Sequence, residues 1–75
     1  MAIFVVENIG GIETGALPSG DMKVWHPINE NLRAIVEGIC RHRGYWEPKY
    51  NNWVVKSRFV DVVLSELSSR AKRIA

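Results

Sequence analysis

The segment spanning residues 44–55, GYWEPKYNNWVV, constrains the fold of this chain more than any other part of it. Trp46 and Trp53 lie on either side of a turn rich in Pro and Asn, which is typical of a β-hairpin. Side chains alternate between the two faces of a strand, so Val55 shares a face with Trp53. One face of the hairpin is therefore apolar, and other parts of the chain must cover it.

Apolar residues recur at helical spacing on both sides of the hairpin and predict two helices that supply this cover. Asn29 is the predicted N-cap of the first helix, and Gly44 is its predicted end. Ser57 is the predicted cap of the second helix. The apolar stripe of the first helix is Ile28, Leu32, Ile35, Val36, Ile39 and Cys40, and that of the second is Phe59, Val60, Val63, Leu64, Leu67, Ala71 and Ile74.

The part of the chain before the first helix predicts two strands. Residues 3–6 are rich in β-formers, and residues 22–26 form a second extended run that ends before Pro27. Residues 7–21 between them have the composition of a loop, either a loose hairpin connection or a mobile flap. The predicted order is ββαββα, an α+β fold in which two helices pack on one face of an antiparallel sheet. The other face of the sheet, or its edge, is then open.

The chain has 75 residues and a mass of 8.5 kDa, which predicts a single domain over residues 1–75. Cys40 is the only cysteine, so the chain can form neither an intrachain disulfide nor a zinc site built on several cysteines. The sequence shows neither a signal-peptide pattern nor an apolar run of membrane-spanning length, which predicts a cytoplasmic protein without membrane contact. We expect no metal and no cofactor.

Charge is distributed unevenly along the chain. Residues 1–37 contain two basic and five acidic residues, whereas residues 38–75 contain eight basic and three acidic residues. Such a chain can present a basic face to a polyanion while its acidic half faces water. The alternative is that a small domain carries uneven charge without any functional meaning.

Three motifs resemble the HARP domain of DNA-annealing helicases: HPIN at residues 26–29, GYWEP at residues 44–48 and WVV at residues 53–55. That family shows an aromatic residue, an acidic residue and a proline, followed after a basic turn by a tryptophan and an apolar strand. The resemblance covers about residues 22–67. The same motifs are similar to related short modules with a G-x-W-x-P…W core in bacterial and phage proteins.

The resemblance implies binding to single-stranded or branched DNA, because HARP-type domains direct their helicases to such structures. In that family the hairpin turn is typically rich in Lys and Arg, whereas residues 49–52 here, KYNN, carry one charge. The sequence contains no helicase motor motif, so any DNA role would be that of a free module or a partner subunit.

Two groups of residues are candidates for nucleic-acid contact. We predict that Trp46 and Trp53 belong to the core, whereas Tyr50 at the hairpin tip could stack on a base, or simply be a solvated turn residue. Cations next to the hairpin could contact phosphates, although cations are also ordinary residues at helix ends. The full candidate set is Arg41, Arg43, Lys49, Tyr50, Asn52, Lys56 and Arg58.

Catalysis finds little support in the sequence, so we do not expect an enzyme. His26 and His42 are the only histidines, and no carboxylate is spaced to complete an acid/base or metal site with them. We predict a non-catalytic nucleic-acid-binding module that grips single-stranded or branched DNA. The alternative hypothesis is a protein-interaction or assembly module, a homodimer or accessory subunit, which pairs through an open sheet face or through the edge of the N-terminal strand.

Overall fold

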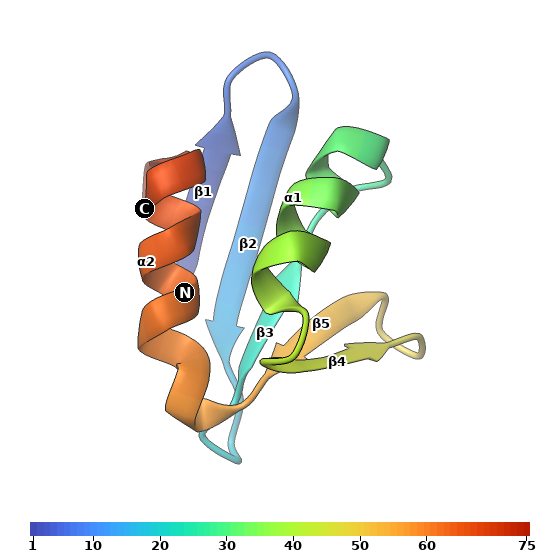
Figure 1. Cartoon of the computed structure of the whole chain (residues 1–75), viewed down its shortest axis with the longest axis vertical. Coiled ribbons are helices and arrows are strands. Elements are labelled where there is room, and N and C mark those ends of the chain that lie inside the picture. Colours follow the sequence, from blue (N-terminus) through green and yellow to red (C-terminus); the bar gives the residue numbers. More distant parts are fainter.

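A computed structural model describes residues 1–75 and shows a six-stranded antiparallel sheet with both helices on one face (Figure 1). The strands lie in the order β4-β5-β3-β2-β1-β6. The elements are β1 (Ala2–Val6), β2 (Gly10–Ala16), β3 (Met22–Trp25), α1 (Glu30–Cys40), β4 (Gly44–Glu47), β5 (Asn52–Val55), the 3-10 turn η1 (Ser57–Phe59), α2 (Val60–Arg70) and β6 (Lys72–Arg73). The predicted α+β class is confirmed, and the observed order contains two strands that the sequence did not predict.

The first unpredicted strand is β2, which lies within the segment that has loop composition. It pairs with β1 on one side and with β3 on the other, so it is a central strand of the sheet. Ile12 and Thr14 are buried under the helices, whereas glycines occupy positions 10, 11 and 15 on either side of them. Glycine weakens the local preference for a strand. Pairing on both edges and burial of one face nevertheless stabilise the strand here.

The second unpredicted strand is β6, which follows the end of α2 at Arg70. It pairs with β1, and the pairing continues beyond it because the Ile3 N–H donates to the Ala75 carbonyl at 3.2 Å and the Ile74 N–H donates to the Ile3 carbonyl at 2.8 Å. Ile74 therefore does not belong to the second helix as predicted. The N-terminal strand has neighbours on both sides, so it does not offer the open edge that the assembly hypothesis invoked.

The core lies between the helices and the inner face of the sheet. Asn29 caps α1 as predicted, because its side-chain oxygen accepts from the N–H groups of Asn31 and Leu32 at 2.9 and 3.0 Å. Neither α1 nor α2 combines the length and the apolar character that a crossing of a bilayer requires. The largest fully buried side chains are Phe4, Ile12, Leu32, Leu67, Val24, Val36, Val55, Val63 and Cys40.

The ends of the helices differ from the prediction at two residues. The helix α1 ends at Cys40, and His42, at φ 66°, provides the left-handed turn that Gly44 was expected to provide. Gly44 lies in β4 instead, where a Cβ would stand 1.9 Å from the Val54 carbonyl oxygen, so glycine is required for close approach of two strands. Ser57 does not cap α2 with its side chain; its backbone N–H donates to the Asp21 carboxylate at 2.9 Å.

Candidate nucleic-acid interface

The β4–β5 hairpin projects from the sheet beyond the helix α1 (Figure 1). The register pairs Trp46 with Trp53, and the pairing of Val24 with Trp53 places both indoles on the helix-facing side of the sheet. Trp53 is half-buried against the core, whereas Trp46 is 42% exposed. The prediction that both tryptophans belong to the core is therefore wrong for Trp46, because β4 is the edge strand and lies one strand farther from the helices.

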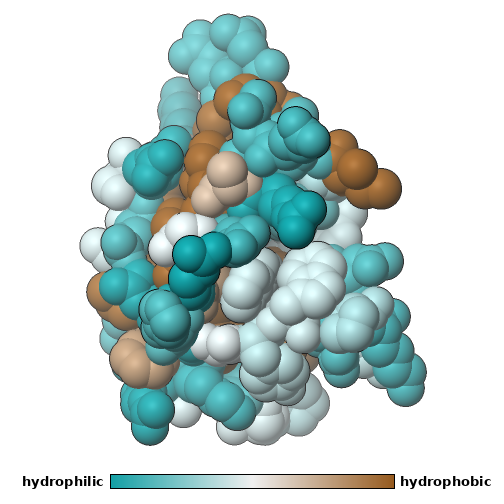
Figure 2. Space-filling model, turned by 45° about the vertical axis from the view of Figure 1, so that its right-hand side comes forward, coloured by the Kyte–Doolittle hydropathy of each residue, from teal (hydrophilic) through white to brown (hydrophobic).

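The exposed indole of Trp46 is held by two neighbouring rings. It meets Trp53 edge to face, with ring centroids 6.1 Å apart and an angle of 72° between the ring planes. His26 lies on another side, with its ring centroid 6.4 Å from that of Trp46 and its Nδ1 atom 2.9 Å from the Pro27 carbonyl oxygen. These three residues are called the aromatic cluster below. Figure 2 shows pale residues, the colour that the hydropathy scale gives to Trp and Tyr, gathered beside hydrophilic ones on the face where the hairpin projects.

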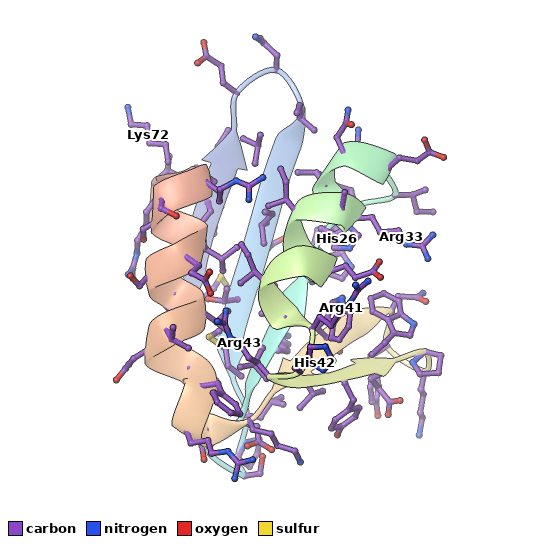
Figure 3. The ribbon with its side chains drawn as sticks, viewed as in Figure 1. His26, Arg33, Arg41, His42, Arg43 and Lys72 are labelled. Atoms are coloured by element: carbon purple, nitrogen blue, oxygen red, sulfur yellow. The ribbon has the colours of Figure 1, made fainter.

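Arg33 of α1 and Arg41, which directly follows this helix, point toward the side from which the hairpin projects. Figure 3 shows Arg33 and Arg41 on this side of the helix. Both guanidinium groups contact the carboxylate of Glu37, Arg33 through its Nε atom at 3.7 Å and Arg41 through its Nη2 atom. The side chains of Arg33 and Arg41 are 75% and 59% exposed, and both guanidinium groups share the single carboxylate of Glu37.

The structure does not bring Arg43 to this side of the molecule. Its Nη1 atom forms an ion pair with the carboxylate of Glu66 in α2 and also donates to the Ile39 carbonyl at 3.1 Å. The Arg43 side chain is only 29% exposed. Arg43 therefore ties the end of α1 to α2, and this geometry leaves it little capacity to hold a phosphate.

The tip of the hairpin provides a second aromatic group with a cation. Tyr50 is 64% exposed, and the Nζ atom of Lys49 lies 5.5 Å from the centre of its ring. Asn51 adopts a left-handed conformation at φ 51° and completes the turn. Asn52 is buried and its Oδ1 atom has no hydrogen-bond partner, so this residue of the candidate set does not present its amide oxygen to a ligand.

The last two candidate cations lie elsewhere. Lys56 places its Nζ atom 5.3 Å from the ring centre of Tyr45, which the register puts on the face of the hairpin opposite Trp46. Arg58 packs its guanidinium over Phe59, 5.0 Å from the ring centre, at the start of the second helical segment. The seven candidate residues thus do not form one surface. Of these residues, Arg41 lies on the side from which the hairpin projects, and Lys49 and Tyr50 lie at the tip of the hairpin.

Three residues of this surface were not among the predicted contacts: the exposed Trp46, His26 and Arg33. Arg33 could have been found from its spacing, because Arg33 and Arg41 both stand four residues from Glu37 and so share one helical face. The exposure of Trp46 had no comparable signal, since it depends on how far the helices reach across the sheet.

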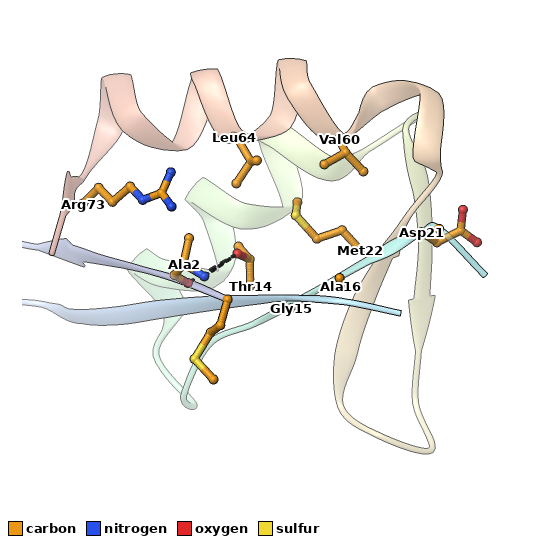
Figure 4. A pocket seen from close by; sticks show the side chains of 11 residues that line it. Ala2, Thr14, Gly15, Ala16, Asp21, Met22, Val60, Leu64 and Arg73 are labelled. Atoms are coloured by element: carbon orange, nitrogen blue, oxygen red, sulfur yellow. Dashed lines mark hydrogen bonds between the residues drawn. The ribbon is translucent and has the colours of Figure 1, made fainter. Parts of the chain in front are cut away.

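A hollow of about 230 Å³ lies between α2 and the strands on the other side of the molecule (Figure 4). Thr14 lines it, but its hydroxyl is engaged with the backbone of Ala2, accepting from the N–H at 3.2 Å and donating to the carbonyl at 3.3 Å. Arg73 and Asp21 stand at opposite ends of the hollow (Figure 4). The volume is below the roughly 300–1,000 Å³ of most small-molecule sites.

Groups suited to metal binding or nucleophilic chemistry do not gather anywhere in the structure. No three His, Cys, Asp or Glu side chains come together as metal ligands would. Cys40 is buried in the core, and this burial raises the pKa of its thiol to about 12, although nearby Arg43 partly opposes the shift. The thiol is therefore protonated and shielded at neutral pH.

Comparison with known proteins finds no matching family model, no matching curated protein and no matching solved structure. The HARP-like character of residues 22–67 thus stays a prediction from the sequence motifs.

Proposed function

We propose that the chain binds single-stranded or branched DNA by stacking a base on Trp46 while Arg33, Arg41 and Lys49 hold the adjoining phosphates. The observation that carries this proposal is the exposed Trp46 indole, fixed by the rings of Trp53 and His26. Proteins that bind single strands combine aromatic platforms with a cationic track along the backbone. The resemblance to HARP domains, although based on short motifs, supports the same class of ligand.

The geometry favours an unpaired strand over an intact duplex. A base can lie flat on an indole only when it has left the helical stack, and single-stranded ends, loops and forks offer such bases. Tyr50 at the hairpin tip would supply a second ring, and the cation of Lys49 stays within 5.5 Å of it. Contacts of this kind involve ring faces and phosphates, which predicts little preference for base sequence.

The test is the affinity of the full chain for fluorescently labelled single-stranded, duplex and forked oligonucleotides, measured by anisotropy at two salt concentrations. We expect the single-stranded and forked probes to bind more tightly than the duplex and to weaken as salt rises. Stacking of one base contributes about 1–3 kcal/mol, so Trp46→Ala should weaken binding by about 5- to 150-fold.

A matched control exists in Trp25, which is 37% exposed but whose side chain lies on the outer face of the sheet. Trp25→Ala removes an indole of similar exposure and should leave the affinity for each probe within about twofold, well below the stacking contribution. Equal losses in the two variants, or equal affinity for all three probes at both salt concentrations, would contradict the proposed platform.

A further inference from the structure

The hollow between α2 and the strands exists because the sheet presents small side chains there (Figure 4). Alternation along β1 and β2 places three of them on the helix-facing side: Ala2, Thr14 and Ala16. The next helix-facing residues along the same two strands, Phe4 and Ile12, are large and fully buried. The partly buried Val60 and Leu64 of α2 form the opposite wall, and a space of about 230 Å³ remains between the two layers.

The interior of this hollow offers water few hydrogen-bond partners. An enclosed water molecule needs about two to four polar partners. The hydroxyl of Thr14 already accepts from the Ala2 N–H and donates to the Ala2 carbonyl. Asp21 stands at one end, but its carboxylate points away from the hollow and accepts from the Ser57 N–H at 2.9 Å. The walls therefore favour a hydrocarbon occupant, which regains the packing contacts that the small side chains leave unmade.

The opposite end of the hollow carries one positive charge. Figure 4 shows the guanidinium of Arg73 reaching from β6 toward Leu64, and its Cζ atom lies 5.9 Å from the ring centre of Phe4. The Nε atom donates to the Ala75 carbonyl oxygen at 3.0 Å. No Asp or Glu side chain pairs with this guanidinium, and its two Nη atoms donate no hydrogen bond within the chain. The Nη groups thus keep free N–H donors in the planar arrangement that a carboxylate accepts.

We propose that the hollow binds a short-chain aliphatic carboxylate, with its hydrocarbon tail between α2 and the strands and its carboxylate on the Nη atoms of Arg73. An apolar cavity of about 150 Å³ takes up a benzene molecule. In proportion, the hollow of about 230 Å³ holds about nine non-hydrogen atoms, as many as heptanoate has. A ligand with an apolar tail and one anionic head matches both the walls and the single charged end.

The test is a titration of the isotope-labelled full chain with sodium heptanoate, followed by the NMR chemical shifts of the backbone amides. We expect the shift changes to concentrate at the residues that line the hollow. The affinity should rise about fourfold with each CH₂ group from pentanoate to heptanoate, because each one buries further hydrocarbon. Shift changes scattered over the surface, or none at millimolar heptanoate, would overturn the proposal.

Substitution of Arg73 tests the charged end separately from the tail. Arg73→Gln should weaken heptanoate binding about fivefold, as expected for an exposed ion pair of good geometry. It should leave 1-heptanol, which has the same tail without the charge, within about twofold. Arg70→Gln is the matched control, because Arg70 is exposed at the end of α2 and does not line the hollow. A heptanoate affinity that is equal in Arg73→Gln and Arg70→Gln would exclude Arg73 as the carboxylate partner.

Substitution of Ala16 tests the tail. Ala16 is exposed at the end of β2, so Ala16→Leu can fill the hollow without entering the core, and it should abolish binding of both heptanoate and 1-heptanol. Circular dichroism shows whether this variant is folded, and the exposed Arg73 gives a decisive result even if it is not. Undiminished binding to folded Ala16→Leu would place the ligand elsewhere. None of these outcomes bears on the DNA-binding proposal, which rests on Trp46 on the other side of the molecule.

Discussion

Replacement of Gly44 by Ala should unfold the hairpin that carries the aromatic cluster. A methyl group at Gly44 would stand 1.9 Å from the Val54 carbonyl oxygen and 2.8 Å from both the Val54 carbonyl carbon and the Val55 Cα. All three atoms belong to the backbone of β5, so no side-chain rotation relieves the overlap. An ordinary contact begins at 3.4 Å, so the carbonyl oxygen would have to retreat by the difference, about 1.5 Å.

Such a shift separates β4 from β5. Overpacking alone costs about 1–3 kcal/mol, and each backbone hydrogen bond lost from the pair, such as that from the Lys56 N–H to the Arg43 carbonyl at 2.9 Å, costs about 1 kcal/mol more. We therefore expect Gly44→Ala to lower the free energy of unfolding by about 3–5 kcal/mol. A domain of 75 residues has a total stability of about 4–11 kcal/mol, so this variant should be largely unfolded or should melt at least about 12 °C lower.

The assay is urea unfolding, followed by circular dichroism and by tryptophan fluorescence, since Trp46 and Trp53 both lie in the affected hairpin. Gly38→Ala is the matched control, because no atom lies within 4 Å of a Cβ at this position in α1. The same methyl group should there stabilise the chain by about 0.8–1 kcal/mol through helix propensity. If Gly44→Ala retained the wild-type stability to within about 1 kcal/mol, the close approach of β4 and β5 would not be the reason for glycine at this position.

Three further predictions concern single residues. Glu37→Gln removes the carboxylate that contacts the guanidinium groups of Arg33 and Arg41. One added phosphate contact should then raise the affinity for single-stranded DNA by about eightfold at about 50 mM salt and make the affinity fall more steeply with salt. Unchanged affinity would exclude these arginines from the interface. Cys40, whose pKa burial raises to about 12, should not react with a thiol reagent at pH 8 until the chain is denatured. In the unfolded chain the Cys40 thiol loses its proton near a pKa of 9.0, whereas in the folded chain it keeps its proton up to a pKa of about 12. The free energy of unfolding should therefore fall as pH rises from 9 toward 12, and it should fall less in Cys40→Ala. Asn52→Val removes a buried oxygen without a hydrogen-bond partner and should raise the free energy of unfolding by about 1 kcal/mol in the same urea assay; a loss of stability would mean that the amide is satisfied in solution.

The sequence by itself determined the elements whose signals are local. The Asn29 cap and the apolar stripe that follows it predicted α1, because an N-cap and a helical period act within a few residues. The pair of tryptophans around a turn predicted the β4–β5 hairpin for the same reason. The α+β class followed from the order of these elements, and it did not require knowledge of which strands pair.

The tertiary structure alone decided the strand β2 and the composition of the candidate interface. Glycines disfavour a strand locally, and residues 10–16 form a strand only because they pair with β1 and β3. Arg41 and Arg43 are equivalent as sequence signals. Arg43 nevertheless forms an ion pair with Glu66, which is distant in the chain, whereas Arg41 stays at the surface beside Glu37. Trp46 is exposed for a similar reason: the helices reach β5 but not the edge strand, and no local pattern records how far a helix extends across a sheet.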